Sequence, residues 1–454
     1  MRRVRVSRRE FLTVAGATGG AALLAACAPA PAGTDEGQAA APAMEDVELQ
    51  LAGWPGQGPE LIEGLETFEE ENPGIKATWL ETPGDYRAKL LSMIAAGTPP
   101  DTAFSTDYYT FARDGLLNDI TDMLMADPLL GAEDYFIQPQ EEERCTWEGR
   151  WYGIGSCWVC HQIYYNRAIF EEEGIDPPSN DPDEIWTWDH FVDVARQMTV
   201  DANGNHPGDS GFDIENVERW GMNIPYWMHW SFVLSNGGYV WHPETRLYGY
   251  DQPEAIEAVQ KVADLVLVDQ VMPNSATFEA IGMGFVQLLE TRTMAMVIEG
   301  SWSMAYTHDM QEPLGTAVLP KMKVPATWLS AHLHTIMQGT KHVDESWKLV
   351  RFLSSPYYQE LFLVSGLWLP SQTALITEEA MDRWMSLEVH REGYRNIATK
   401  WVPDYGHPMY GPPGEGEASG FIWPALDAVW IGDKTAEEAL LEATPKANEV
   451  LENA

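Results

Sequence analysis

The stretch from residue 47 to residue 104 decides the fold class; it reads VELQLAGWPGQGPELIEGLETFEEENPGIKATWLETPGDYRAKLLSMIAAGTPPDTAF. Residues 47–51 alternate between apolar and polar side chains, which is typical of a strand, and residues 59–71 carry apolar side chains at helical spacing. A second strand, a second helix and the start of a third strand complete the stretch. This alternation predicts an α/β fold built on a parallel sheet with helices on both faces.

The carboxyl ends of these strands are the expected position of a ligand site, because ligands of open α/β sheets bind there. Trp54 and Glu81 follow the first two strands, and Asp107 and Tyr108 follow the third. We therefore place these four side chains at the edge of a candidate site.

Length and composition limit the possible classes of protein. The chain has 454 residues, which suggests two or three domains, and its 45% hydrophobic and 21% charged residues exclude wholesale disorder. Its 28 Lys and Arg residues against 69 Asp and Glu residues give a formal charge of -41. Such an acidic surface repels phosphate backbones and anionic lipid headgroups, so nucleic acid is not an expected partner. The 19 Trp residues exceed what a core needs, and we expect some of them to line a site.

Residues 1–27 are expected to be an export signal. A basic start precedes an apolar stretch that is too short to span a bilayer comfortably. Residues 7–12 resemble the twin-arginine export signal, and residues 24–27 resemble the lipobox of bacterial lipoproteins, whose cysteine, here Cys27, is lipidated. Residues 28–46 are typical of a flexible tether. We therefore expect a protein that is lipid-anchored on the outer face of the cytoplasmic membrane, periplasmic or at the cell surface.

A series of short motifs runs along most of the remaining chain. They lie at residues 86–90, 96–101, 115–119, 149–154, 164–170, 187–189, 236–238, 293–296, 300–302, 319–320, 346–350, 352–353 and 366–370. Each motif is weak alone, and their order and spacing across residues 47–371 carry the argument. In that order and spacing, the motifs resemble the extracellular solute-binding proteins (family 1) of ABC importers, the sugar-binding family that includes maltose-binding protein.

The resemblance implies a two-lobe, type II periplasmic-binding-protein fold. Each lobe is then a mainly parallel sheet with flanking helices, and the ligand lies in the cleft between the lobes. The expected N-terminal lobe comprises residues 47–156 and 322–354, and the expected C-terminal lobe comprises residues 162–320 and 366–454. The expected crossings between the lobes lie at residues 156–161, 319–324 and 355–366.

The resemblance also implies the function. We expect a substrate-binding protein that captures a sugar or oligosaccharide by hinge closure and delivers it to the permease subunits of an ABC importer. No enzymatic activity, cofactor or metal is expected, and the membrane is contacted only through the lipid anchor. The alternatives are an exported glycoside hydrolase, whose cleft needs a pair of carboxyl groups, and a binding protein for a non-sugar polar solute.

Aromatic and polar side chains together suit a sugar, whose ring has an apolar face and a rim of hydroxyl groups. Core packing is the alternative for each aromatic candidate, and a cap or a solvated loop is the alternative for the carboxylates. For Trp302 we also expect Gly300 to let the backbone approach a ligand, since glycine has no Cβ. The candidate ligand-binding residues are Trp54, Glu81, Asp107, Tyr108, Trp158, Trp227, His229, Trp230, Glu299, Trp302, His332 and Trp368.

Cys157-Trp158-Val159-Cys160-His161 matches the attachment pattern of c-type haem. Haem attachment needs an unfolded chain with both thiols exposed, whereas a twin-arginine signal implies export of a folded protein. We therefore expect no haem, and a disulfide between two of Cys145, Cys157 and Cys160, with the pairing left open. We also expect His332 and His334 to face opposite sides of a strand, which argues against a shared metal ion.

Overall fold

The structure is a computed structural model that describes residues 46–106, 108–132 and 134–454. The expected signal segment, the lipidation site Cys27, the tether up to residue 45 and the candidate Asp107 lie outside the described residues. None of the described helices is long and apolar enough to cross a membrane.

The first sheet contains the strands that the opening stretch predicts. Its order is β2-β1-β3-β13-β6, with β1 parallel to β2 and β3, and with β13 antiparallel to β3 and β6. Alternation in the sequence of β1 produces its inward-facing leucines, Leu49 and Leu51, which are completely buried. The strands are β1 (Val47–Gly53), β2 (Ile75–Glu81), β3 (Thr102–Ser105), β6 (Ile154–Gly155) and β13 (Leu333–Ile336).

Helices and a small hairpin complete this part of the chain, which we call the first lobe. Their apolar faces pack on the sheet; in α2, for example, Leu61, Leu65 and Phe68 are buried at helical spacing. The elements are α2 (Gly58–Glu71), α3 (Tyr86–Ala95), α4 (Tyr108–Arg113), α5 (Thr121–Ala126), α6 (Gln140–Cys145), β4 (Thr146–Trp147), β5 (Arg150–Trp151), α13 (Val343–Leu353) and α14 (Pro356–Val364).

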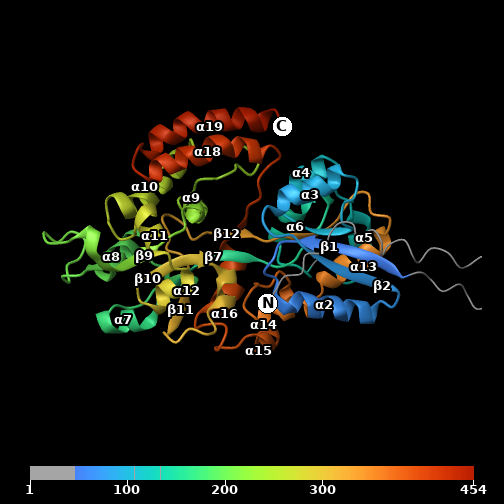
Figure 1. The fold of residues 1–454 in the computed structure, drawn as a ribbon, viewed down its shortest axis with the longest axis horizontal. Helices are drawn as coiled ribbons and strands as arrows, with labels where there is room; N and C mark the ends of the chain where they lie inside the picture. The colour runs from blue at the N-terminus through green and yellow to red at the C-terminus, as the bar shows by residue number, and fades with distance from the viewer. Residues whose placement is uncertain (1–45, 107, 133) are drawn as a thin grey trace, which may run out of the picture. The chain divides into compact units, whose positions relative to one another are not determined.

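The second sheet is built around one long strand, β7, and defines the second lobe (Figure 1). Its order is β14-β12-β7-β10-β9-β8, and β11 also pairs with β7. The neighbours of β7 all run antiparallel to it, whereas β10 is parallel to β9, so this sheet is mixed. The strands are β7 (Val159–Asn166), β8 (Val200–Asp201), β9 (Val217–Asn223), β10 (Met294–Gly300), β11 (Leu314–Ala317), β12 (Thr327–Ser330) and β14 (Gly406–Pro408).

Helices surround the second sheet, and α18 and α19 pack against each other beside α10 (Figure 1). These helices pack through an apolar face; α8, for example, contacts β9 and buries Trp188, Phe191, Ala195 and Met198 at helical spacing. The helices are α7 (Arg167–Glu173), α8 (Trp188–Met198), α9 (Trp230–Ser235), α10 (Pro253–Leu267), α11 (Ser275–Ile281), α12 (Phe285–Glu290), α15 (Glu378–Trp384), α16 (Tyr394–Asn396), α17 (Val402–Tyr405), α18 (Glu415–Trp430) and α19 (Ala436–Glu452).

The chain passes between the two sheets at positions that differ in part from the expectation. The first passage runs from the end of β6 at Gly155 to the start of β7 at Val159, inside the expected range. The second lies at residues 331–332, between β12 and β13. The expected crossing at residues 319–324 is wrong, because residues 327–330 still pair with β7 in the second sheet.

The expected third crossing at residues 355–366 falls mostly on α14, which packs against α2 and α13 of the first lobe. Gly64 of α2 allows this close packing, because a Cβ there would meet the ring of Tyr358 at 2.5 Å. The chain leaves the first lobe after α14, where Leu369 pairs with Trp158 through two backbone hydrogen bonds of 2.8 and 2.9 Å.

Candidate functional site

A pocket of about 400 Å³ lies where the carboxyl ends of β1, β3 and β10 meet the passages between the sheets. Both lobes contribute to its lining, and we call it the aromatic cleft. Four tryptophans and one tyrosine make it strongly aromatic. The lining residues are Trp54, Pro55, Gly56, Gln57, Thr106, Cys157, Val159, Trp302, Tyr306, Trp328, Ser330, Ala331, His332, Leu367 and Trp368.

Trp54 follows the end of β1, where the alternating sequence pattern predicts it. Its indole makes edge contacts with Tyr86, Phe104 and His332, with ring centroids 5.6, 5.6 and 5.1 Å apart. It remains partly exposed, so one face is available to the cleft. The preceding position, residue 53, suits a glycine because a Cβ there would collide with the rings of Trp79 and Phe104.

Trp302 lies on the short 3₁₀ helix that follows β10 and is partly exposed. Its ring plane lies 12° from that of Trp227, with centroids 6.2 Å apart, and 82° from that of Trp328. The expected role of Gly300 is corrected here. A Cβ on Gly300 would collide with the indole of Trp302, so this glycine makes room for the tryptophan itself.

His332 and Trp368 are each only 3% exposed within the lining of the cleft. The His332 ring stacks on Phe104 with centroids 3.8 Å apart, and Trp368 stacks on Phe362 at 3.9 Å and 12°. Burial lowers the pKa of His332 well below its usual value, so its imidazole is neutral at pH 7. Both rings therefore act as fixed aromatic surfaces rather than as charged groups.

Sequence reasoning did not identify Trp328, Tyr306 and the neutral polar lining residues Gln57, Thr106 and Ser330. Trp328 and Ser330 lie two residues apart on β12. Both reach the cleft because alternate residues of a strand share a face. An alternating reading of residues 327–330 would have found this pair.

Three predicted ligand-binding residues lie in the core instead, and these assignments are corrected. Trp158 is completely buried, with the Arg144 guanidinium 3.6 Å above its ring. Tyr108 is completely buried against Tyr109 and Tyr410.

His229 is the third residue of this kind. Its two ring nitrogens are occupied by the Tyr226 carbonyl and the Tyr250 hydroxyl, both at 2.6 Å, and the side chain is completely buried. Large aromatic side chains next to a strand end satisfy the same sequence pattern whether they face a cleft or the core, and only packing distinguishes the two.

The other candidates surround the cleft without lining it. Glu81 is exposed at the end of β2. Glu299 accepts a hydrogen bond of 2.8 Å from the N–H of Gly300, and burial raises its pKa. Trp227 and Trp230 make an edge contact at 6.1 Å and belong to the tryptophan cluster behind Trp302.

The predicted disulfide is wrong, because Cys145, Cys157 and Cys160 are three separate, buried thiols. Burial raises the pKa of the Cys157 and Cys160 thiols, that of Cys157 to about 12. Both side chains are buried, with 1% of Cys157 and 0% of Cys160 exposed.

The expectation for His332 and His334 was also wrong. Residues two apart in an extended segment share a face, and the two ring centroids lie 5.2 Å apart. Within the described part of the chain, no group of three or more His, Cys, Asp or Glu side chains is arranged to hold a metal ion.

Comparison with known proteins agrees with this geometry. Residues 52–360 match the family described as bacterial extracellular solute-binding protein. A relative from Brucella abortus (strain 2308), described as a binding protein, is 23% identical over 452 residues, which is 96% of this chain and 98% of the relative.

Solved structures show the same fold. An ABC substrate-binding protein from Listeria monocytogenes, in complex with cycloalternan, superposes with a TM-score of 0.75 at 20% identity, covering 89% of this chain and 99% of that one. The sugar-binding protein MalE from Xanthomonas citri superposes with a TM-score of 0.72 at 17% identity, covering 90% and 98%.

Proposed function

Because the chain belongs to the family of bacterial extracellular solute-binding proteins, we propose that it captures a sugar or short oligosaccharide in the aromatic cleft for an ABC importer. The observation that carries the proposal is the set of tryptophans that converge on the cleft from separate segments: Trp54, Trp302, Trp328 and Trp368. Indole faces cover the apolar face of a pyranose, and neutral side chains such as Gln57, Thr106 and Ser330 suit its hydroxyl groups.

Hinge closure is the proposed mechanism of capture. Both lobes line the cleft, and they are joined at narrow passages such as residues 156–158 and 331–332. A sugar that stacks on the wall of one lobe becomes enclosed when the other lobe rotates toward it, because the enclosed state adds contacts that the open state lacks.

Binding is favoured over glycoside hydrolysis by the character of the lining. A hydrolase needs two carboxyl groups about 5–5.5 Å or about 6.5–9.5 Å apart. Among the described residues that line the cleft, none carries a carboxyl group. Asp107, next to the lining residue Thr106, lies outside the described residues.

Delivery and anchoring complete the proposal. We place the protein outside the cytoplasmic membrane, attached through lipidated Cys27, and presenting the closed, loaded form to the permease. Cys27→Ser is expected to move the protein from the membrane fraction to the soluble fraction. Retention of unlabelled Cys27→Ser protein on the membrane contradicts the anchor.

Isothermal titration against a panel of mono- and oligosaccharides tests the sugar proposal, with Trp302→Ala as the decisive variant. Covering about 80 Å² of apolar surface at ~25 cal/mol per Å² contributes about 2 kcal/mol, so Trp302→Ala should weaken binding more than tenfold. Trp347→Ala, a partly exposed tryptophan on α13 outside the cleft lining, serves as the matched control. No binding across the panel, or equal binding by Trp302→Ala, contradicts the proposal.

A further inference from the structure

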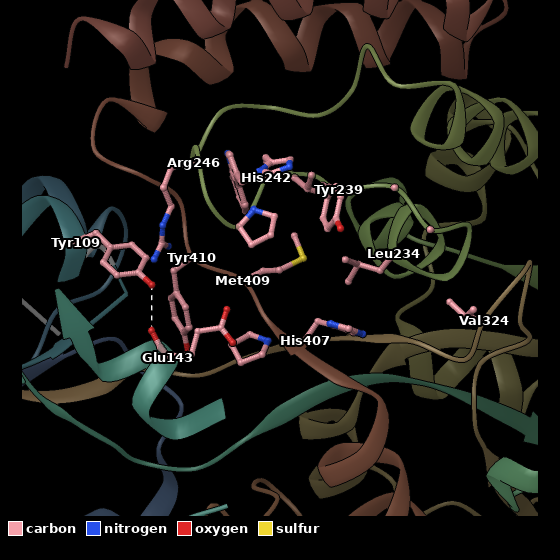
Figure 2. A pocket seen from close by; sticks show the side chains of 16 residues that line it. Tyr109, Glu143, Leu234, Tyr239, His242, Arg246, Val324, His407, Met409 and Tyr410 are labelled. Carbon is pink, nitrogen blue, oxygen red and sulfur yellow. Dashed lines mark hydrogen bonds between the residues drawn. The ribbon is translucent and has the colours of Figure 1, made fainter. Parts of the chain in front are cut away.

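A second pocket, of about 300 Å³, shares no lining residue with the aromatic cleft (Figure 2). The first lobe contributes Tyr109 of α4 and Glu143 of α6. The second lobe contributes residues 237–243 and Arg246, and further lining comes from residues 407–410. We call this cavity the charged pocket, because it presents one guanidinium group and one carboxylate to the same space.

Arg246 is held in an unusual backbone conformation that brings its side chain to the pocket. It lies in a tight turn, in which the N–H of Arg246 donates to the His242 carbonyl at 2.8 Å. Its φ is +60°, a left-handed value that is unfavourable for a residue with a Cβ. Strained residues of this kind cluster at functional sites.

The guanidinium of Arg246 lies over the Tyr109 ring, with Cζ 4.3 Å from the ring centroid. Among the described residues, no side-chain hydrogen bond or ion pair engages this guanidinium. Stacking leaves the N–H edge of the group free, and that edge matches a carboxylate in bidentate geometry.

Glu143 supplies the opposite charge. The Tyr109 hydroxyl donates to the backbone carbonyl of Glu143 at 3.1 Å, and Figure 2 shows the carboxylate directed toward the middle of the pocket. The surrounding protein raises the pKa of this carboxyl group by desolvation, and Arg246 opposes that shift without coming within ion-pair distance. In the described chain, no donor is hydrogen-bonded to the carboxylate.

Apart from Arg246 and Glu143, the described lining residues of the charged pocket include no Asp, Glu, Lys or Arg. Tyr239, Trp241 and Tyr410 add aromatic surface to that of Tyr109. The Tyr410 hydroxyl is already engaged, because it donates to the Ala331 carbonyl at 2.9 Å. Desolvation by the surrounding protein lowers the pKa of His407.

From these observations we propose that the charged pocket is a second ligand site, separate from the sugar cleft, for a small zwitterion that carries an ammonium group and a carboxylate on an apolar body. The ligand carboxylate binds the free edge of Arg246, and the ammonium group binds Glu143 among aromatic faces. Arg246 repels a ligand that is only cationic, and Glu143 repels one that is only anionic. The volume, at the lower end of the ~300–1,000 Å³ usual for ligand pockets, suits a single amino acid.

Isothermal titration of the full chain with L-phenylalanine at pH 7 and constant ionic strength tests the proposal. N-acetylphenylalanine lacks the ammonium group, and phenethylamine lacks the carboxylate, so each is expected to bind at least tenfold more weakly. Glu143→Gln and Arg246→Gln are each expected to weaken phenylalanine binding at least tenfold. Glu142→Gln, which alters the exposed neighbouring carboxylate on α6, is expected to change nothing.

Each other outcome overturns the proposal. Absence of saturable binding by phenylalanine removes the site, and equal binding by phenethylamine makes it a simple cation site. Equal binding by Glu143→Gln and Arg246→Gln places the ligand elsewhere. Since Trp302→Ala alters only the aromatic cleft, loss of phenylalanine binding in that variant assigns the amino acid to the cleft.

Discussion

At the scale of single residues, Gly300 and Trp302 act as one unit. The indole of Trp302 occupies the space that a Cβ on residue 300 would take, so the position of the ring in the cleft depends on the glycine. Gly300 has an ordinary φ of -71°, so an alanine here adds no backbone strain, and its whole effect falls on the neighbouring ring.

We therefore predict that Gly300→Ala displaces the Trp302 ring and weakens sugar binding about tenfold, which corresponds to ~1.4 kcal/mol. Titration calorimetry with the best sugar of the panel measures the loss. Gly284→Ala is the matched control, because a Cβ there meets no atom within 4 Å and its φ is -76°. Unchanged affinity in Gly300→Ala would show that the resting position of the Trp302 ring does not matter for binding.

His334 is a second residue whose environment has a measurable consequence. Its ring is completely buried near Phe104 and Tyr358, and neither ring nitrogen has a hydrogen-bond partner. Burial lowers its pKa from 6.5 to about 3. The folded protein therefore holds this ring neutral between pH 3 and pH 6.5, where the unfolded chain takes up a proton, and stability falls as the pH decreases through that window.

The variant His334→Leu removes this proton linkage. At pH 5.5 the unfolded histidine is about ten-elevenths protonated. Lowering the pH from 8 to 5.5 should therefore reduce the free energy of unfolding of wild type by about 1.4 kcal/mol more than that of His334→Leu. Urea denaturation at both pH values measures the difference. If the two proteins respond to pH in parallel, His334 is already protonated or hydrogen-bonded in the folded state.

At the scale of secondary-structure elements, α6 fastens the first passage between the lobes. Arg144 donates from Nε to Glu141 at 2.7 Å and from Nη1 to the Cys157 carbonyl at 2.6 Å. The other Glu141 oxygen accepts from the N–H of Gly155 at 2.7 Å. Both charged side chains are completely inaccessible, so the helix holds the end of β6 and the start of the passage through one buried ion pair.

Removing one partner of this pair should be costly. Arg144→Met leaves Glu141 buried without its counter-ion and is expected to lower the free energy of unfolding by about 3–5 kcal/mol. The double variant Glu141→Gln with Arg144→Met should recover part of that loss, because it removes the uncompensated charge.

Thermal and urea denaturation provide the measurement, and Arg150→Met is the matched control. Arg150 pairs with Asp119 at 2.6 Å, but its side chain is 46% exposed, so its loss should cost less than about 1 kcal/mol. Equal losses for Arg144→Met and Arg150→Met would show that the buried pair contributes no more than a surface pair.

At the scale of the whole molecule, the charge imbalance dominates. A formal charge of -41 makes the folded chain repel itself, and dissolved salt screens that repulsion. We predict that raising NaCl from about 20 to about 200 mM raises the melting temperature, since the Debye length falls from roughly 20 to roughly 7 Å. Sucrose at equal osmolality controls for general solute effects, and an equal rise in sucrose would rule out screening as the cause.

The arrangement of the two lobes was predictable from motif order, whereas the passages between them were predictable only in part. Residues 327–330 form a short strand, and nothing in their local sequence decides which of the two sheets the strand joins. Its assignment to the second sheet depends on pairing with β7, more than 160 residues earlier in the chain. Residues 356–364 likewise form a helix from local signals, but its position against α2 is a long-range contact.

The sequence by itself determined the α/β class, the family-like order of motifs, the strand ends that carry Trp54 and Trp302, and the acidic surface, because these follow from local periodicity, from composition and from motif order. Only the tertiary structure decided which aromatic side chains face the cleft. It put Trp158, Tyr108 and His229 in the core and Trp328 in the lining. It also separated the cysteines and brought Arg246 to Tyr109 and Glu143. These outcomes depend on contacts between distant segments, which no local pattern encodes.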